Sequence, residues 1–194
     1  MKYTYVYIIV FISALVCCEN SDEKITIESS TEGLELVNGI LELNKISFSG
    51  RLTTRFENNK LKSEIFYDKG KKHGSEKYWS KSGALIQERF YKNGYKAGTH
   101  SAWWSPKSPK FVYHFNNQGA FHGEVKEWYR SGQLYMSFNY ENGNENGRQQ
   151  LWKVDGTIKA NYEVVHSERF GLIGLKKCNN VSDSEIREIV KNEQ

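Results

Sequence analysis

Apolar and polar side chains alternate along the middle of the chain with a period of two. In one run, apolar side chains stand at Leu134, Met136, Phe138 and Tyr140, and polar ones lie between them. A similar run begins at Leu61. Alternation of this kind predicts β-strands that each present one apolar face.

The alternating runs recur at a spacing that glycines mark. Six glycines follow one another at steps of 24 or 25 residues, namely Gly50, Gly74, Gly98, Gly123, Gly147 and Gly171. A fixed period predicts tandem repeats, and we assign five units to residues 50–170. We number each unit from its glycine, which is position 0. Because these glycines are periodic, we interpret them as turn glycines. Asn93-Gly94 and Asn142-Gly143 mark another turn, because both central residues of a type I′ turn need positive φ.

Tryptophan occupies position +5 in four of the five units: Trp79, Trp103, Trp128 and Trp152. A two-residue turn near +9 would pair position +5 with +12 and put tryptophan on the more polar face. A three-residue turn that ends in glycine would pair +5 with +11. It would put tryptophan beside the Leu/Tyr row, the apolar side chains at positions +11 to +17, such as Leu134 to Tyr140. We favour the second arrangement because it gathers apolar area on one face. In the third unit, Pro106 and Pro109 predict a longer, irregular loop, since proline cannot donate to a β-ladder.

Different patterns flank the repeats. Residues 33–49 alternate around Asn38-Gly39 and predict a lead-in hairpin. After Gly171 the alternation ends, and residues 171–194 form a C-terminal tail. Within this tail Ser182-x-x-Glu185 is typical of a helix start. It predicts a short capping helix over residues 183–191, which would cover the last strand edge.

The first 18 residues read as an export signal. A positive start, Met1-Lys2, precedes an apolar run that is too short to span a membrane. Leu15 and the terminal Cys18 resemble a bacterial lipoprotein signal, although Cys17 departs from the small residue usual at −1; an ordinary secretory peptide is the alternative. The resemblance implies that Cys18 is lipidated and anchors the protein in the bacterial cell envelope, at the outer membrane. Residues 19–32 would form a flexible tether.

The repeat units resemble a known family. The closest copies of the pattern are Gly74-x(3)-Tyr78-Trp79-x(3)-Gly83 and Gly123-x(4)-Trp128-Tyr129-x(2)-Gly132. The pattern resembles the MORN repeat, in the variant found in YwqK-like antitoxin proteins. The resemblance runs from about Ser49 to Phe170. It implies an all-β fold, an elongated single-layer antiparallel meander of stacked hairpins. It also implies a scaffold for protein or membrane interaction, and in some members an antitoxin role.

Composition and charge narrow the function. The net charge is +4, and Lys and Arg alternate with Asp and Glu, so the chain shows no basic stripe for nucleic acid. The histidines form no metal-binding cluster. His100 and His114 lie on the two strands of the third unit, where they could face each other, but no nearby cysteine or carboxylate would complete a site. Apart from Cys18, the expected lipidation site, Cys178 is the one cysteine expected in the mature chain. Neither a catalytic motif nor a phosphate loop occurs. We therefore expect no enzyme, no metal and no cofactor.

Aromatic residues form the candidate binding surface. Its members are Trp79, Trp103, Trp104, Trp128, Trp152, Tyr91, Phe115 and Tyr140. These rings either pack on one another to hold a one-layer sheet together, or form an exposed strip that binds a partner. Our hypothesis is a non-enzymatic, lipid-anchored scaffold with a protein partner. The alternatives are a glycan-binding surface protein, with polysaccharide stacked on the aromatic rows, and an antitoxin for an exported toxin.

Overall fold

A computed structural model of the chain describes residues 25–174 and 176–178. Within these ranges the protein is all-β, and no helix is long and apolar enough to cross a membrane. The strands are β1 Thr26–Glu28, β2 Leu34–Val37, β3 Ile40–Leu43, β4 Ile46–Ser47, β5 Gly50–Arg55, β6 Leu61–Asp68, β7 Lys71–Trp79, β8 Leu85–Lys92, β9 Tyr95–Ser105, β10 Ser108–Phe115, β11 Gly123–Trp128, β12 Leu134–Glu141, β13 Asn144–Trp152, β14 Ile158–Val165, β15 Glu168–Ile173 and β16 Lys176–Cys178.

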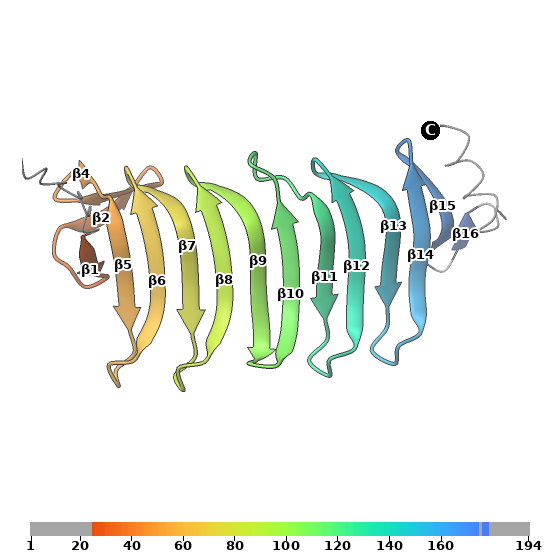
Figure 1. Cartoon of the computed structure of the whole chain (residues 1–194), viewed down its shortest axis with the longest axis horizontal. Coiled ribbons are helices and arrows are strands. Elements are labelled where there is room, and N and C mark those ends of the chain that lie inside the picture. Colours follow the sequence, from red (N-terminus) through yellow and green to blue (C-terminus); the bar gives the residue numbers. More distant parts are fainter. Residues whose placement is uncertain (1–24, 175, 179–194) are drawn as a thin grey trace, which may run out of the picture.

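The strands form one long sheet and a small one. The long sheet has 13 strands in the order β1, then β5 to β16, and consecutive strands from β5 onward pair antiparallel. Figure 1 shows this sheet as a single elongated layer of hairpins, with the three-stranded sheet β2–β4 at its N-terminal end. The predicted all-β, single-layer architecture is confirmed. The predicted helix over residues 183–191 lies outside the described residues.

Each regular unit uses two kinds of turn. At the first, the Ser80 amide donates to the Ala84 carbonyl (2.8 Å) and the Gly83 amide donates to the Ser80 carbonyl (2.9 Å). This is a three-residue turn that ends in Gly83, whose φ is +96°. The second turn is Asn93-Gly94, with φ of 52° and 87°. Both turn types agree with the sequence, and Trp79 pairs with position +11, as the favoured arrangement required.

The third unit exchanges its two turns. Ser105 pairs with Ser108, so the Pro106-Lys107 turn has only two residues. The three-residue turn moves to the other edge, where the Asn116 amide donates to the Ala120 carbonyl (2.9 Å). The predicted longer loop at the prolines is therefore wrong. Pro106 suits the second position of a tight turn, and the unit's extra residue is accommodated at the opposite edge.

Three position-0 glycines, Gly74, Gly98 and Gly147, lie in bulges between hairpins, which corrects their interpretation as turn glycines. Gly74 lies inside β7, where the β6–β7 register shifts between Ile65↔Glu76 and Tyr67↔Lys72. The same shift recurs between later hairpins. The bulge leaves φ of Gly74 at +89°, a backbone region that side chains rarely adopt.

The two faces of the sheet differ in chemistry. We call the first the aromatic face; it includes Ile65, Glu76, Phe115 and Tyr162. We call the other the polar face, where Lys77 forms an ion pair with Glu88, Arg51 with Glu64, and Lys126 with Glu124, among others.

Tryptophan lies on the polar face, which corrects the predicted face. The β7–β8 register shifts between Tyr78, which pairs with Gln87, and Trp79, which pairs with Leu85. Tyr78 lies on the aromatic face, and the next side chain along a strand points to the opposite face. In the first unit, Arg55 occupies the tryptophan position and bonds to Glu28 (2.9 Å) on the face opposite to Ile65. The bulge thus moves the +5 and +11 side chains away from the Leu/Tyr row.

The ends of the sheet carry more structure than the sequence indicated. Residues 26–28, assigned to the tether, form β1 and pair parallel with β5. The lead-in hairpin is confirmed as β2 and β3, and β4 extends it. Its sheet docks through backbone bonds, in which the Leu41 amide donates to the Gly70 carbonyl (2.9 Å) and the Gly70 amide donates to the Phe48 carbonyl (2.8 Å). In the assigned C-terminal tail, β15 and β16 continue the sheet past Gly171.

Replacing the bulge glycine should cost stability through the backbone alone. A Cβ at position 74 would lie 3.6 Å from the Phe66 Cβ, an ordinary contact, so space is not the obstacle. We expect Gly74→Ala to lower the free energy of unfolding by about 1–2 kcal/mol in urea titrations, because positive φ strains L-residues. Gly74→Asn should lose less, since asparagine tolerates this region better. Equal stability of wild type and Gly74→Ala would contradict the bulge assignment.

Candidate functional site

The aromatic face carries a continuous row of rings. Tyr91 lies 5.4 Å from His100, measured between ring centroids, and His100 lies 4.6 Å from Phe115. Phe115 in turn stacks on Phe121 at 4.8 Å, and Phe121 lies 5.1 Å from Tyr140. The structure therefore brings together three predicted residues, Tyr91, Phe115 and Tyr140. They form part of a packed layer in which Phe115 is only 9% exposed.

Residues at position −2 cover this row, a feature that the sequence interpretation missed. Phe48 lies 6.3 Å from Tyr67, and Phe121 lies beside Tyr140 as described above. Two lysines take the same role by cation–π contact: Lys72 lies 5.1 Å from the Tyr91 ring and Lys96 lies 5.3 Å from the Phe115 ring. An aromatic or cationic residue stands two positions before five of the six glycines, Gly147 being the exception, and this recurrence is the signal that could have revealed the cover. The covered row therefore acts in packing.

Carboxylates beneath the rings are satisfied by tyrosine hydroxyls and cations. Glu76 is 1% exposed, accepts hydrogen bonds from Tyr78 (3.2 Å) and Tyr91 (3.1 Å), and contacts Lys72 and Arg89. Burial, reinforced by the Glu76 charge, raises the pKa of Tyr78 from 10.0 to about 12. The same pattern recurs farther along the sheet, where Tyr113 donates to Glu127 (2.5 Å) and Tyr162 donates to Glu145 (3.1 Å). These groups hold the packed layer together.

The tryptophans form a separate row. Trp79, Trp103, Trp128 and Trp152 each pair with the residue at position +11, which is Leu85, Pro109, Leu134 and Ile158, respectively. All four are half-buried. Among the described residues, none of the ring–ring contacts involves them. The predicted binding surface thus divides into a packed aromatic row and a tryptophan row on the opposite face.

Position +6 joins neighbouring hairpins beside the tryptophan row. The Trp104 indole Nε1 donates to the Trp128 carbonyl (3.1 Å), and the Tyr129 hydroxyl donates to the Trp152 carbonyl (3.1 Å). Trp104 is 37% exposed, and its ring has cations over it: Lys110 at 4.5 Å and Arg130 at 5.8 Å from the centroid. We define the tryptophan edge as positions +5 to +12 of all five units, residues 55–62, 79–86, 103–110, 128–135 and 152–159.

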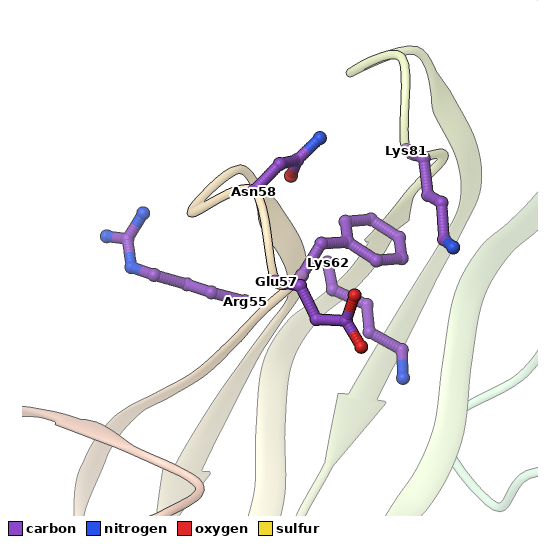
Figure 2. Close-up of a pocket in the computed structure, with 6 residues that line it drawn as sticks. Arg55, Glu57, Asn58, Lys62 and Lys81 are labelled. Carbon is purple, nitrogen blue, oxygen red and sulfur yellow. The ribbon is translucent and has the colours of Figure 1, made fainter.

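A hollow opens at one end of the tryptophan edge. Its volume is about 390 Å³, and its lining residues are Arg55, Phe56, Glu57, Asn58, Lys62 and Lys81. Figure 2 shows Lys62 and Lys81 on the same side of the turn, whereas Arg55 points away from them. The Lys62 ammonium lies 5.9 Å from the Phe56 ring centroid, which repeats the cation–aromatic contact at Trp104. Lysine side chains from two consecutive units thus line the same hollow as an aromatic ring.

Histidines have structural partners. His100 is 2% exposed and its Nε2 lies 2.7 Å from the Phe90 carbonyl; burial lowers its pKa. His100 pairs with Tyr113 and His114 with Thr99, so the two histidines occupy opposite faces and do not face each other. Within residues 25–174 and 176–178, no three His, Cys, Asp or Glu side chains are grouped as metal ligands.

Comparison with known families identifies part of the array. Residues 49–69, 72–93 and 121–144 match the family model of the MORN repeat variant. The three matched segments cover most of the first, second and fourth units. The match includes neither the third unit, with its exchanged turns, nor the fifth. Repeats of this kind commonly mediate protein or membrane interactions. No curated protein matches the chain.

Alkaline pH should destabilise the repeat sheet through its tyrosines. The pKa of Tyr78 is about 12 in the folded protein, above its ordinary value of 10.0, so the folded state holds this proton more tightly. The resulting stability is complete below pH 10 and is lost as the pH rises through about 12. We expect Tyr78→Phe to make the decline in unfolding free energy between pH 10 and 12 shallower, measured by urea titration at each pH. Tyr95→Phe, at a side chain 64% exposed, is the control; identical slopes in wild type and Tyr78→Phe would contradict the assignment.

Proposed function

We propose that the protein is a non-enzymatic scaffold that binds a protein partner in the bacterial cell envelope, where a lipid on Cys18 anchors it. MORN repeat variants support a role in interaction, and the packed aromatic face supports a stable platform for it. The observation that carries the proposal is an apolar surface on the small N-terminal sheet.

The apolar surface lies on one face of the β2–β4 sheet. Leu36 is 70% exposed and Ile46 is 73% exposed. Strand register places them on the same face as the half-buried Leu34 and Leu43. Burying such side chains against a partner is favourable by about 25 cal/mol per Å² of apolar area. Clustered, exposed apolar side chains on a folded protein mark an interaction site.

The proposed anchor keeps this surface near a membrane. Ile25, the first described residue, follows Cys18 by seven positions. A fully extended chain of that length spans at most about 25 Å. A lipid on Cys18 would therefore hold the N-terminal sheet within reach of partners in the same membrane.

Partner binding should depend on the apolar surface. We expect cross-linking in envelope extract to join the wild-type protein to one defined protein species, and Leu36→Ser/Ile46→Ser to abolish that product. Val154→Ser is the matched control, because Val154 is 65% exposed but lies in a turn of the fifth unit. A cross-link that survives in the double variant, or is lost equally in the control, would refute the proposed surface.

Lipid attachment should depend on one cysteine. We expect Cys18→Ala to abolish incorporation of radiolabelled fatty acid in the producing cell, because the proposed lipid is attached to Cys18. Cys17→Ala should keep the label, since an alanine at −1 fits the resemblance to lipoprotein signals better than cysteine does. Undiminished labelling of Cys18→Ala would overturn the anchor.

A further inference from the structure

The fold gathers positive charge that is scattered along the sequence. The tryptophan edge contains nine Lys and Arg residues against two carboxylates, Glu57 and Asp155, a formal charge of +7 compared with +4 for the whole chain. The Asp155 carboxylate is occupied by its own turn, where it accepts hydrogen bonds from Thr157. The expectation that cations do not cluster therefore holds along the chain but not in space. Because like charges at one edge repel, their gathering favours an anionic ligand.

Aromatic rings repeat along the same edge. Equivalent strands of consecutive hairpins are two strands apart, so tryptophans recur at roughly 10 Å intervals. Cations accompany the rings at both the first and third units, as Lys62 does at Phe56 and Lys110 at Trp104. The edge is therefore a linear series of flat apolar faces with positive charge beside them.

We propose that the tryptophan edge binds a linear acidic polysaccharide. Sugar rings present C–H bonds whose slight positive charge suits the negative face of an indole ring. Carboxylate or sulfate groups on the same polymer would pair with the lysines and arginines of the turns. A polymer with regularly repeated rings and charges matches a protein edge with a regular repeat. This site is separate from the apolar surface of the N-terminal sheet and does not depend on a protein partner there.

Other anionic partners fit the edge less well. Membrane insertion requires apolar side chains at the turn tips, whereas the tips are mostly polar, as at Lys81-Ser82-Gly83. Protein interfaces are depleted in lysine, which supplies most of the cations here. Stacked nucleotides follow one another at about 3.4 Å, far closer than the rings of this edge. The export that we predict from residues 1–18 would also bring the edge into contact with envelope polysaccharides.

Binding to alginate, a linear polymer of uronic acids, tests the proposal. We expect the full-length protein to bind alginate in calorimetric titrations and to bind uncharged dextran at least tenfold more weakly. Lys81→Gln/Lys107→Gln/Lys110→Gln should weaken alginate binding at least tenfold. The matched control, Lys69→Gln/Lys71→Gln/Lys92→Gln, removes the same charge from exposed residues at the opposite edge and should leave binding unchanged.

A second variant tests the stacking. Trp104→Ala should weaken binding severalfold, and Trp104→Phe should retain most of it; circular dichroism verifies that both variants fold. Absence of alginate binding would overturn the proposal, as would equal losses in the two lysine variants. Tighter binding of oligothymidylate or of phosphatidylglycerol vesicles than of alginate would also overturn it, in favour of nucleic acid or membrane. Loss of the protein cross-link with alginate binding intact would remove only the proposed scaffold function.

Discussion

Backbone pairing between each hairpin and the next holds this protein in shape, because its side chains pack within a single layer. The pairing is not uniform. Its register shifts at the same point of successive junctions, beside a glycine such as Gly74 with positive φ. A bulge bends and twists the strand that contains it. The 24-residue spacing of glycines therefore reflects a requirement of the junction between hairpins rather than of the turns.

Packing on the aromatic face follows from that register. A one-layer sheet cannot bury side chains beneath a second layer, so its members cover one another. Rings from position +17 lie under residues from position −2, and Glu76 receives hydrogen bonds from two tyrosines. Hydrogen bonds to a buried carboxylate contribute about 1.5–3 kcal/mol each. Mixed aromatic and polar packing of this kind explains how a polar chain maintains a stable sheet.

The sequence predicted the features that local chemistry determines. Asn93-Gly94 predicts a type I′ turn, and the alternation around Phe138 predicts a strand with one apolar and one polar face. The face of Trp79 could not be predicted in the same way. The ladder skips one residue of β8 between the pairs Tyr78↔Gln87 and Trp79↔Leu85, and a shift of one residue moves a side chain to the opposite face. The tryptophan edge was hidden for a different reason. Lys81, Lys107 and Arg130 are far apart in sequence and become neighbours only when hairpins stack.

The exchanged turns of the third unit have a consequence for how the array unfolds. Strands β10 and β11 share only two ladder pairs, Phe111↔Glu127 and Val112↔Lys126, with one isolated bridge at Phe115↔Phe121. The β5–β6 hairpin has six. In a linear array, stability is nearly a sum over neighbouring interfaces, so the weakest interface sets where cooperativity breaks. We therefore expect the sheet to divide first at the junction after the third unit when it unfolds, where side-chain contacts such as Tyr113–Glu127 supply much of the pairing.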